Sequence, residues 1–327
     1  MAYSDNEASA MPEYDPVLSE FDLSLRRTFF PLGYPLELET NSSDVMLAAE
    51  EAWGAIERMF QRDPVRICLG VAESDSPSPA PMSRIRAREH LMSIVADPAN
   101  FLMCDFDRGF GFGWVTPETA ADRAMLRYQF LTPGGIALAQ QRAFAPLHGA
   151  LVMRGGTGVM FCGDSSAGKS TLAYACARAG WTYVSDDGAF LVRSRDDRYA
   201  VGDPHLVRFR PDARELFPEL ARHVPAARPN GKITMEICPP DLGLTTAPGC
   251  AVDHVVFLDR APGGMASVQG YPKDRALEYW AQYTVLGPGE VRAEQRRCQE
   301  HLLRAGLWGM RYSQLDDAVS RLERLVR

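Results

Sequence analysis

The chain has no long apolar run and no sign of an export segment. Among its 327 residues, no stretch approaches the roughly 20 apolar residues that a membrane-spanning helix needs. The N-terminus, MAYSDNEASAMPEYDP, is acidic and polar, whereas a secretory signal is basic and then apolar. These features predict a cytoplasmic protein without a membrane partner.

An excess of basic charge and a regular spacing of cysteines are also missing. The formal net charge is −7 and no long basic run is present, which argues against a nucleic-acid partner because such binding depends on a basic footprint. The seven cysteines form no C-x-x-C pair, and none lies at zinc-finger spacing from a histidine. We therefore expect buried thiols rather than disulfides or a structural zinc.

Lysine is nearly absent. Of the 35 basic residues, only Lys169, Lys232 and Lys273 are lysines. Where arginine is the usual cation, a lysine indicates a position that needs a compact, rotatable ammonium group. Lys169 and Lys232 are therefore candidates for function, whereas chance survival in an arginine-biased coding background is the simpler interpretation of Lys273.

The length is enough for about two domains of ordinary size. Residues 1–20 show no apolar periodicity and are predicted to form a disordered tail. Residues 21–135 are predicted to be an N-terminal α+β domain of unclear role, with a hairpin in NFLMCDFDRGFGFGWV and a helix from Pro117 toward Tyr128. The aromatic residues of DFDRGFGFGW would either line an acceptor pocket or pack in the core.

Residues 136–327 are predicted to be an α/β domain with C-terminal helices. HGALVMRGGTGVMFCG indicates two strands around a turn, AGKSTLAYACARAG a helix, and WTYVSDDGAFLVRS two strands around an acidic turn. The runs KITMEI and DHVVFLD predict further strands, and helices are expected near residues 272–284, 289–305 and 313–326. Strands and helices that alternate in this way are typical of an α/β sheet domain.

The stretch GDSSAGKST matches the phosphate-binding pattern G-x-x-x-x-G-K-[ST]. Such a loop turns its backbone N–H groups toward phosphate oxygens at the start of a helix. Lys169 would reach the β and γ phosphates, and the Ser170 hydroxyl would ligate Mg²⁺. The alternative is a glycine-rich helix start without a ligand, which the expected strand before it and helix after it disfavour. The candidate nucleotide-binding residues are Gly163, Asp164, Ser165, Ser166, Ala167, Gly168, Lys169, Ser170 and Thr171.

Two adjacent carboxylates, Asp186 and Asp187, follow the loop after one helix, one turn and one strand. They would lie at the C-terminal end of a strand, where open α/β sheets bind ligands. One can bind Mg²⁺ while the other accepts the proton of an attacking hydroxyl. An ordinary aspartate with a pKa of about 4 suffices for this, because the proton leaves late in a loose transition state. The alternative is a plain Asp-Gly turn in a β-hairpin, which SDDGAF also fits.

A histidine stands just before the first strand of the second domain. His148 lies in PLHGALV, and an isolated histidine at a strand start is more often a surface or capping residue than a catalytic one. Its neighbours change this interpretation. Together, LHGALV, GDSSAGKSTLA and WTYVSDDGAFLV resemble HPr kinase/phosphorylase and the wider set of HPr kinase-like proteins, over about residues 145–260. The resemblance implies a P-loop kinase domain of the HPr kinase type.

The resemblance also implies roles for individual residues. Asp186 would be the general base that becomes an acid in the reverse reaction, and His148 would sit beside it and tune it. Asp187, together with Ser170, would be on the metal side.

Further candidates come from two later segments. GDPHLVRFRP falls where the family carries a phosphate-facing arginine, which nominates Arg208 or Arg210, and NGKITMEI resembles the family's lysine-bearing strand, which nominates Lys232. The segment DARELFPELARHVPAARPN stands where the bifunctional enzymes have a glycine-rich signature. We therefore expect an acceptor other than HPr.

The resulting hypothesis is an ATP- and Mg²⁺-dependent kinase that phosphorylates a hydroxyl, with a serine of a peptide or protein, or a small molecule, as acceptor. Two alternatives stay open: a nucleotide-binding regulatory or scaffolding protein without phosphoryl transfer, and an ATPase. The complete set of candidate residues disfavours the first, and the early Asp-Asp pair disfavours the second. A homo-oligomer is compatible with the sequence.

Overall fold

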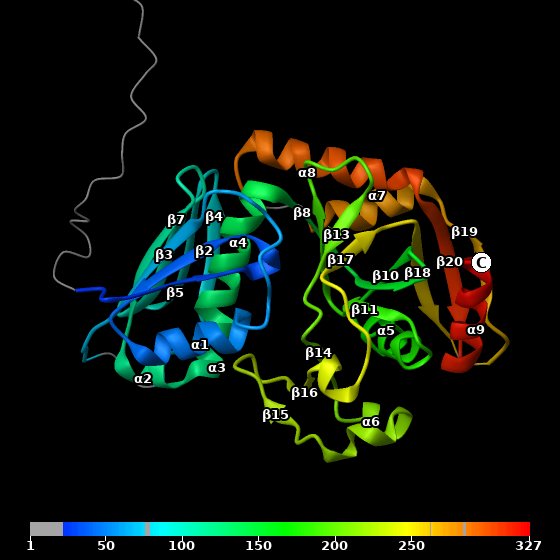
Figure 1. Ribbon diagram of the computed structural model, residues 1–327, viewed down its shortest axis with the longest axis horizontal. Coiled ribbons are helices and arrows are strands. Elements are labelled where there is room, and N and C mark those ends of the chain that lie inside the picture. The colour runs from blue at the N-terminus through cyan, green and yellow to red at the C-terminus, as the bar shows by residue number, and fades with distance from the viewer. Residues whose placement is uncertain (1–21, 76–78, 262, 284–285) are drawn as a thin grey trace, which may run out of the picture.

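The computed structural model describes residues 22–75, 79–261, 263–283 and 286–327. Within them the chain is a mixed α/β protein with four β-sheets, which confirms the α/β class. A seven-stranded sheet with its helices lies beside a second part that holds the other three sheets (Figure 1). The tail expected over residues 1–20 lies outside the described residues, and the domain division at residue 135 stays a prediction.

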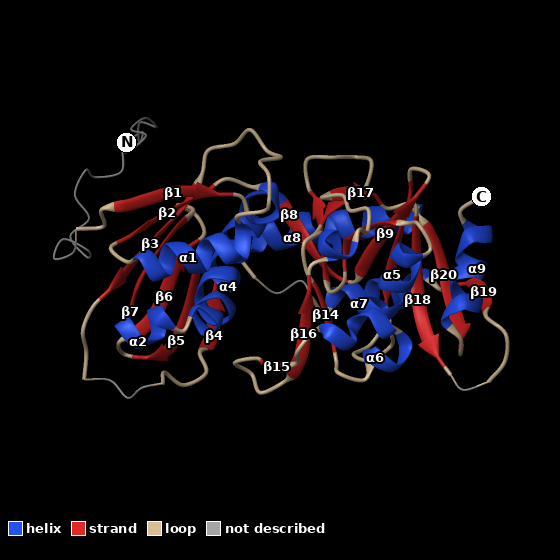
Figure 2. Cartoon of the chain, turned by 60° about the horizontal axis from the view of Figure 1, so that its bottom comes forward, coloured by secondary structure: helices blue, strands red, loops and turns tan. Residues whose placement is uncertain are grey.

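The N-terminal sheet has the order β1-β2-β3-β7-β6-β5-β4. Alternating burial along β2 and β6 shows that one face is turned to the core, and α4 packs on that side (Figure 2). The elements are β1 (Leu25–Phe29), η1 (Pro31–Gly33), β2 (Leu36–Thr40), α1 (Ser43–Trp53), β3 (Val65–Val71), β4 (Arg84–Arg88), β5 (Leu91–Asp97), β6 (Asn100–Asp105), β7 (Phe110–Val115), α2 (Pro117–Ala121), α3 (Arg123–Leu126), η2 (Arg127–Leu131) and α4 (Thr132–Ala143).

The hairpin predicted in the aromatic segment is confirmed as the antiparallel pair β6–β7. Phe106, between the two strands, belongs to the hydrophobic core, whereas the aromatic side chains of β7 belong neither to a core cluster nor to the lining of either cavity described below. Phe110, Phe112 and Trp114 are half-buried on one face of β7, while the buried Gly111 and Gly113 alternate with them. A β-strand turns successive side chains to opposite faces, and this explains the separation.

The six-stranded sheet of the second part has the order β11-β9-β10-β18-β20-β19. α5 and α9 share one hydrophobic core with it, and α7 contributes to another. The three helices predicted after residue 270 are confirmed, whereas β20 between the last two is a strand that the sequence pattern does not indicate. No helix in the described part of the chain is both long and apolar enough to cross a membrane.

Two smaller sheets complete the second part, with the orders β17-β13-β12-β8 and β14-β16-β15. The hairpin alternative for SDDGAF is wrong, because β11 pairs with β9 whereas β12 pairs with β8 and β13 in a different sheet. The elements of the second part are β8 (Phe144–His148), β9 (Ala150–Arg154), β10 (Thr157–Cys162), α5 (Lys169–Arg178), β11 (Thr182–Ser185), β12 (Gly188–Val192), β13 (Tyr199–Val201), β14 (Val207–Phe209), α6 (Ala213–Leu216), η3 (Pro218–Arg222), β15 (Ala226–Ala227), β16 (Ile233–Ile237), η4 (Pro239–Leu242), β17 (Gly249–Ala251), β18 (His254–Arg260), β19 (Ser267–Gly270), α7 (Lys273–Ala281), α8 (Gly289–His301), η5 (Leu302–Arg304), β20 (Gly306–Tyr312) and α9 (Leu315–Leu325).

Candidate active site

The candidate phosphate loop connects β10 to α5 at the edge of the six-stranded sheet where the carboxyl ends of its parallel strands lie. β10 and β20 each run parallel to β18, and β9 lies antiparallel between β10 and β11. The strands β10, β11, β18 and β20 therefore all end at the same edge. This edge brings together the loop, the aspartate pair that follows β11 and the end of β20.

Positive φ angles shape the loop. They occur at Gly163 (147°), Ser166 (73°) and Gly168 (94°). A Cβ atom on Gly168 would collide with the hydroxyl of Tyr312, which donates a hydrogen bond to the Ala167 carbonyl at 3.2 Å. Glycine is therefore required at residue 168 both by backbone conformation and by space.

The loop residues differ in exposure. Asp164, Ser165 and Ser166 are exposed, and Thr171 is half-buried in the first turn of α5. Lys169 is only 7% exposed, and its Nζ donates to the carbonyls of Gly163 at 2.7 Å and Asp164 at 3.1 Å. Burial lowers the pKa of Lys169, and nearby Asp187 opposes that shift. The ammonium thus lies folded against the backbone of the loop.

The carboxyl of Asp186 is buried next to the loop helix. Its Oδ2 accepts a hydrogen bond from the backbone N–H of Arg208 at 2.9 Å, and the Ser170 hydroxyl donates to the Asp186 main-chain carbonyl at 3.4 Å. Burial raises the pKa of Asp186 to about 7, while the bond from Arg208 lowers it and Asp187 raises it further. The carboxyl is therefore balanced between its acid and base forms near neutral pH, unlike the ordinary aspartate expected from the sequence.

The ladder between β8 and β12 brings His148 to the aspartate pair. His148 lies opposite Gly188, and its Nδ1 is 3.5 Å from Oδ1 of Asp187. Burial lowers the pKa of His148, and Lys169 lowers it further, while Asp187 raises it. The imidazole is therefore mostly neutral at neutral pH. The family resemblance implies a contact between His148 and Asp186; the side-chain contact in the structure is with Asp187.

A tyrosine that the sequence pattern does not reveal ties the loop to His148. The hydroxyl of Tyr279 on α7 accepts a hydrogen bond from the N–H of Gly163 at 3.1 Å. Its single hydrogen is within reach of two carbonyls, that of Gly163 at 2.9 Å and that of His148 at 3.0 Å. Since α7 lies more than 100 residues from the loop in sequence, no local signal could have found this contact.

The two nominated arginines lie at different distances from the loop. Arg210 reaches it directly, because its Nη2 donates to the Ser166 hydroxyl at 3.1 Å. The guanidinium of Arg208 instead pairs with Glu236 on β16 at 3.0 Å, and only its backbone contacts the aspartate pair. Arg210 is thus the arginine whose side chain can meet a phosphate at the loop.

Lys232 is exposed at the start of β16, and among the described residues its side chain forms no hydrogen bond or ion pair with the loop. The turn between β15 and β16 contacts the N-terminal part. Asn230 donates to the hydroxyl of Tyr128 at 2.6 Å, and the Arg228 guanidinium lies 4.5 Å from the centre of the Tyr128 ring. The structure therefore does not bring Lys232 to the other predicted site residues.

The oxygen atoms around the loop fit a hard divalent cation. Asp187 offers a carboxylate and Ser170 a hydroxyl oxygen at the same end of the sheet, and these are donor types that Mg²⁺ prefers. The hydrogen bond from the Ser170 hydroxyl to the Asp186 main-chain carbonyl keeps this hydroxyl on the aspartate side of α5. A cation here would lie between the loop and the aspartate pair.

No protein-family model and no curated protein matches the chain. Among solved structures, one similarity is to the Hpr(Ser) kinase/phosphatase from Coxiella burnetii, with 12% sequence identity and a TM-score of 0.28. The match covers 55% of this chain and 96% of that one. A similarity this small indicates a distant structural relationship only and carries no weight for the chemistry of the site.

Proposed function

We propose that the protein is an ATP- and Mg²⁺-dependent kinase that transfers the γ-phosphoryl group to a hydroxyl, either of a serine in a peptide or protein or of a small molecule. The observation that carries this proposal is the buried carboxyl of Asp186, with a pKa raised to about 7, next to a loop of the phosphate-binding pattern. A site that only binds a nucleotide has no need of a poised base.

In the proposed reaction the acceptor oxygen attacks the γ-phosphorus, its bond to phosphorus forms, and the bond from phosphorus to the bridging oxygen breaks to release ADP. The acceptor proton moves to a carboxylate oxygen of Asp186. A base with a pKa near the working pH is effective in both directions, because it can take a proton and return it. Oδ1 is the oxygen not engaged by the Arg208 N–H, so we assign the proton to it.

The other residues position and neutralise charge. Backbone N–H groups of the loop and the Lys169 ammonium would bind the phosphates, after Lys169 exchanges its two carbonyl partners for phosphate oxygens. Arg210 adds a cation at the mouth of the loop. Mg²⁺, when bound, supplies positive charge to the phosphate oxygens. Neutral His148 orients Asp187, and the role of Lys232 stays a prediction.

The two other functions differ from this one in their products. A regulatory or scaffolding protein would bind ATP and release no ADP, and an ATPase would release ADP and inorganic phosphate. The buried base beside the loop supports transfer over binding alone. Burying an ionisable carboxyl costs free energy of folding, and a site that only binds a nucleotide would gain nothing from it. The comparison between ADP and phosphorylated product separates all three.

The test is to incubate the full chain with γ-labelled ATP, Mg²⁺ and a panel of serine peptides and hydroxyl metabolites, and to measure ADP and labelled acceptor together. Equal amounts of the two, lost in Lys169→Ala, support the kinase. ADP accompanied only by inorganic phosphate with every acceptor would favour the ATPase. Nucleotide binding without ADP would favour the regulatory protein.

A further inference from the structure

A second candidate site lies far from the loop, where the N-terminal part meets the second part. A cavity of about 470 Å³ there is lined by four arginines, Arg62, Arg142, Arg193 and Arg297, and by one acidic residue, Glu294. Four positive charges and one negative charge leave a net charge of +3 at the cavity, in a chain whose formal net charge is −7. A concave, positively charged surface attracts anions, because the low-dielectric walls concentrate the field.

The arginines come from four separate segments. Arg62 lies between α1 and β3, Arg142 in the last turn of α4, Arg193 directly after β12, and Arg297 on α8. Folding therefore gathers like charges that are remote in sequence, against their mutual repulsion. Such a cluster is unfavourable unless counter-charges neutralise it.

The protein itself supplies little counter-charge. Within the described part of the chain, Arg193 is the one arginine of the four that forms a salt bridge, and its partner is Glu294. Arg142 donates to a neutral group, the carbonyl of Asp107, at 2.8 Å. Among the described residues, the other three arginines of the cavity therefore have no acidic partner.

Arg193 forms the buried part of the lining. Its side chain is 11% exposed, and one guanidinium nitrogen donates to the Gln141 carbonyl at 2.6 Å. Its Nε is buried and has no hydrogen-bond partner. The guanidinium of Arg193 is therefore held at the wall of the cavity by Glu294 and by the Gln141 carbonyl.

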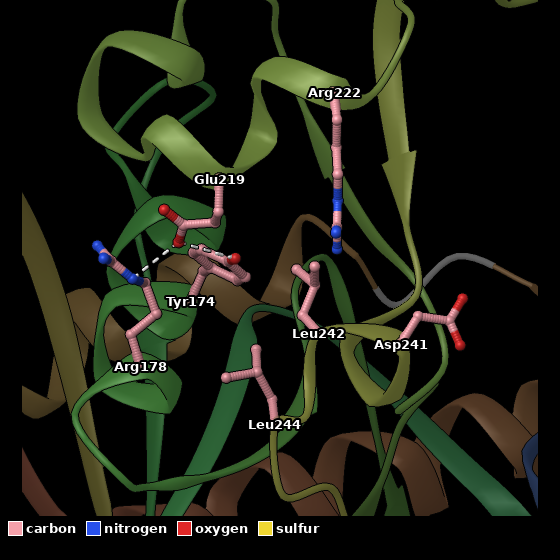
Figure 3. Close-up of a pocket in the computed structure, with 7 residues that line it drawn as sticks. All are labelled: Tyr174, Arg178, Glu219, Arg222, Asp241, Leu242 and Leu244. Atoms are coloured by element: carbon pink, nitrogen blue, oxygen red, sulfur yellow. Dashed lines mark hydrogen bonds and ion pairs between the residues drawn. The ribbon is translucent and has the colours of Figure 1, made fainter.

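The cavity of Figure 3 provides a contrast. It measures about 360 Å³, and its charged residues balance in number, with two arginines, Arg178 and Arg222, and two acidic residues, Glu219 and Asp241. Figure 3 shows Glu219 engaged by Arg178 and by the Tyr174 hydroxyl, at 2.8 Å and 3.2 Å. Of these two cavities, the one between the two parts is the one with an excess of positive charge.

We propose that the cavity between the two parts binds a small polyanion that carries phosphate or carboxylate groups. Its charged groups would pair with Arg62 and Arg142 on the N-terminal side and with Arg193 and Arg297 on the other. The cavity volume falls within the range of small-molecule sites. By offsetting the net positive charge of the cavity, the anion ties the two parts together.

This site is distinct from the candidate active site. β8 and β12 separate the two, with His148 and Gly188 paired at one end and Phe144 and Val192 at the other. Five residues of strand span about 13 to 17 Å, so Arg193, directly after Val192, lies at the opposite end of these strands from His148. The inference does not depend on the proposed kinase function.

The test uses pyrophosphate and citrate as probes, titrated into the full chain by calorimetry at fixed ionic strength. Every titration is repeated with Lys169→Ala, so that pyrophosphate bound at the phosphate loop is recognised. We expect at least one probe to bind and to raise the melting temperature. A preference for pyrophosphate identifies phosphate groups as the ligand chemistry, and a preference for citrate identifies carboxylates.

The double variant Arg62→Gln/Arg297→Gln removes two exposed cations of the lining and should weaken binding by about tenfold or more without lowering the melting temperature of the free protein. Arg193→Gln should abolish binding. Arg222→Gln, at the cavity of Figure 3, is the matched control and should bind as the parent does. Absence of binding by both probes at millimolar concentration, or equal affinity in the double variant and its parent, would overturn the proposal.

Discussion

The backbone N–H of Arg208 donates to the carboxyl of Asp186 across 2.9 Å, from the strand β14 to the end of β11. This bond favours the ionised carboxylate, whereas burial favours the neutral acid and is the larger effect. The result is a carboxyl with a pKa raised to about 7 beside the candidate phosphate loop. Several measurable consequences depend on this balance.

Asp186→Asn should stabilise the protein at pH 8. Because the folded-state pKa of about 7 lies above the unfolded value of about 4, the folded state binds the additional proton between these two values. Stability from this group is complete below about pH 4 and is lost as the pH rises to about 7, at a cost of a few kcal/mol. Denaturant unfolding at pH 4 and pH 8 should show the variant's advantage at pH 8 alone. Asp187→Asn, at an exposed carboxylate, is the control, and an equal pH dependence in Asp186→Asn and wild type would contradict the assigned pKa.

Phosphoryl transfer should lose rate on the acid side of neutrality. With the base form of Asp186 required, kcat/KM should fall about tenfold for each pH unit below about 7. The profile should be measured with saturating Mg²⁺, and nucleotide affinity should be followed in parallel to separate binding from chemistry. A rate that is flat between pH 5 and 8 would exclude Asp186 as the base.

Gly168→Ala should disrupt the loop. The substitution places a Cβ against the Tyr312 hydroxyl and puts alanine at a φ of 94°, so we expect a loss of about 1 to 3 kcal/mol in stability together with weaker nucleotide binding. Tyr312→Phe removes the hydroxyl and its bond to Ala167, at a cost of about 1 kcal/mol. In the double variant the loss of stability should be smaller than the sum of the two single-variant losses, and a double-mutant cycle followed by thermal unfolding would show this. Full additivity would mean that the hydroxyl is not what excludes the alanine.

Tyr279→Phe should loosen the connection between the loop and His148. The Gly163 N–H loses its acceptor, so stability should fall by about 1 to 2 kcal/mol and nucleotide affinity should fall with it. Tyr271→Phe, which keeps a ring stacked on Phe257 in the same region, serves as the matched control. Equal nucleotide affinity in both variants would show that the Tyr279 hydroxyl does not hold the loop.

Local patterns were enough to predict the loop and its neighbouring elements. Glycines at 163 and 168, the alanine-rich helix α5 and the glycine at 180 act over a few residues, and the structure has the strands β9 and β10 and the helix α5 where the sequence predicts them. The helices α7, α8 and α9 likewise lie within the segments in which the sequence predicts helices.

Contacts between remote segments could not be predicted in this way. β20 contains two glycines, an arginine and a tryptophan, and its strand conformation depends on parallel pairing with β18. The Asp-Gly dipeptide after Asp186 suits a hairpin, yet β11 and β12 enter different sheets because each finds a better partner elsewhere. Tyr279 and Tyr312 reach the loop only through tertiary packing, and the raised pKa of Asp186 results from burial that no local pattern encodes.

The most direct test of the kinase proposal compares Asp186→Asn with the wild type in single-turnover transfer from γ-labelled ATP and in nucleotide affinity. Because asparagine keeps the shape of aspartate but cannot accept the proton, we predict a transfer rate lower by about 10² to 10⁴ with nucleotide affinity nearly unchanged. Lys169→Ala should weaken both. Transfer by Asp186→Asn at the wild-type rate would contradict the assignment of Asp186 as the base.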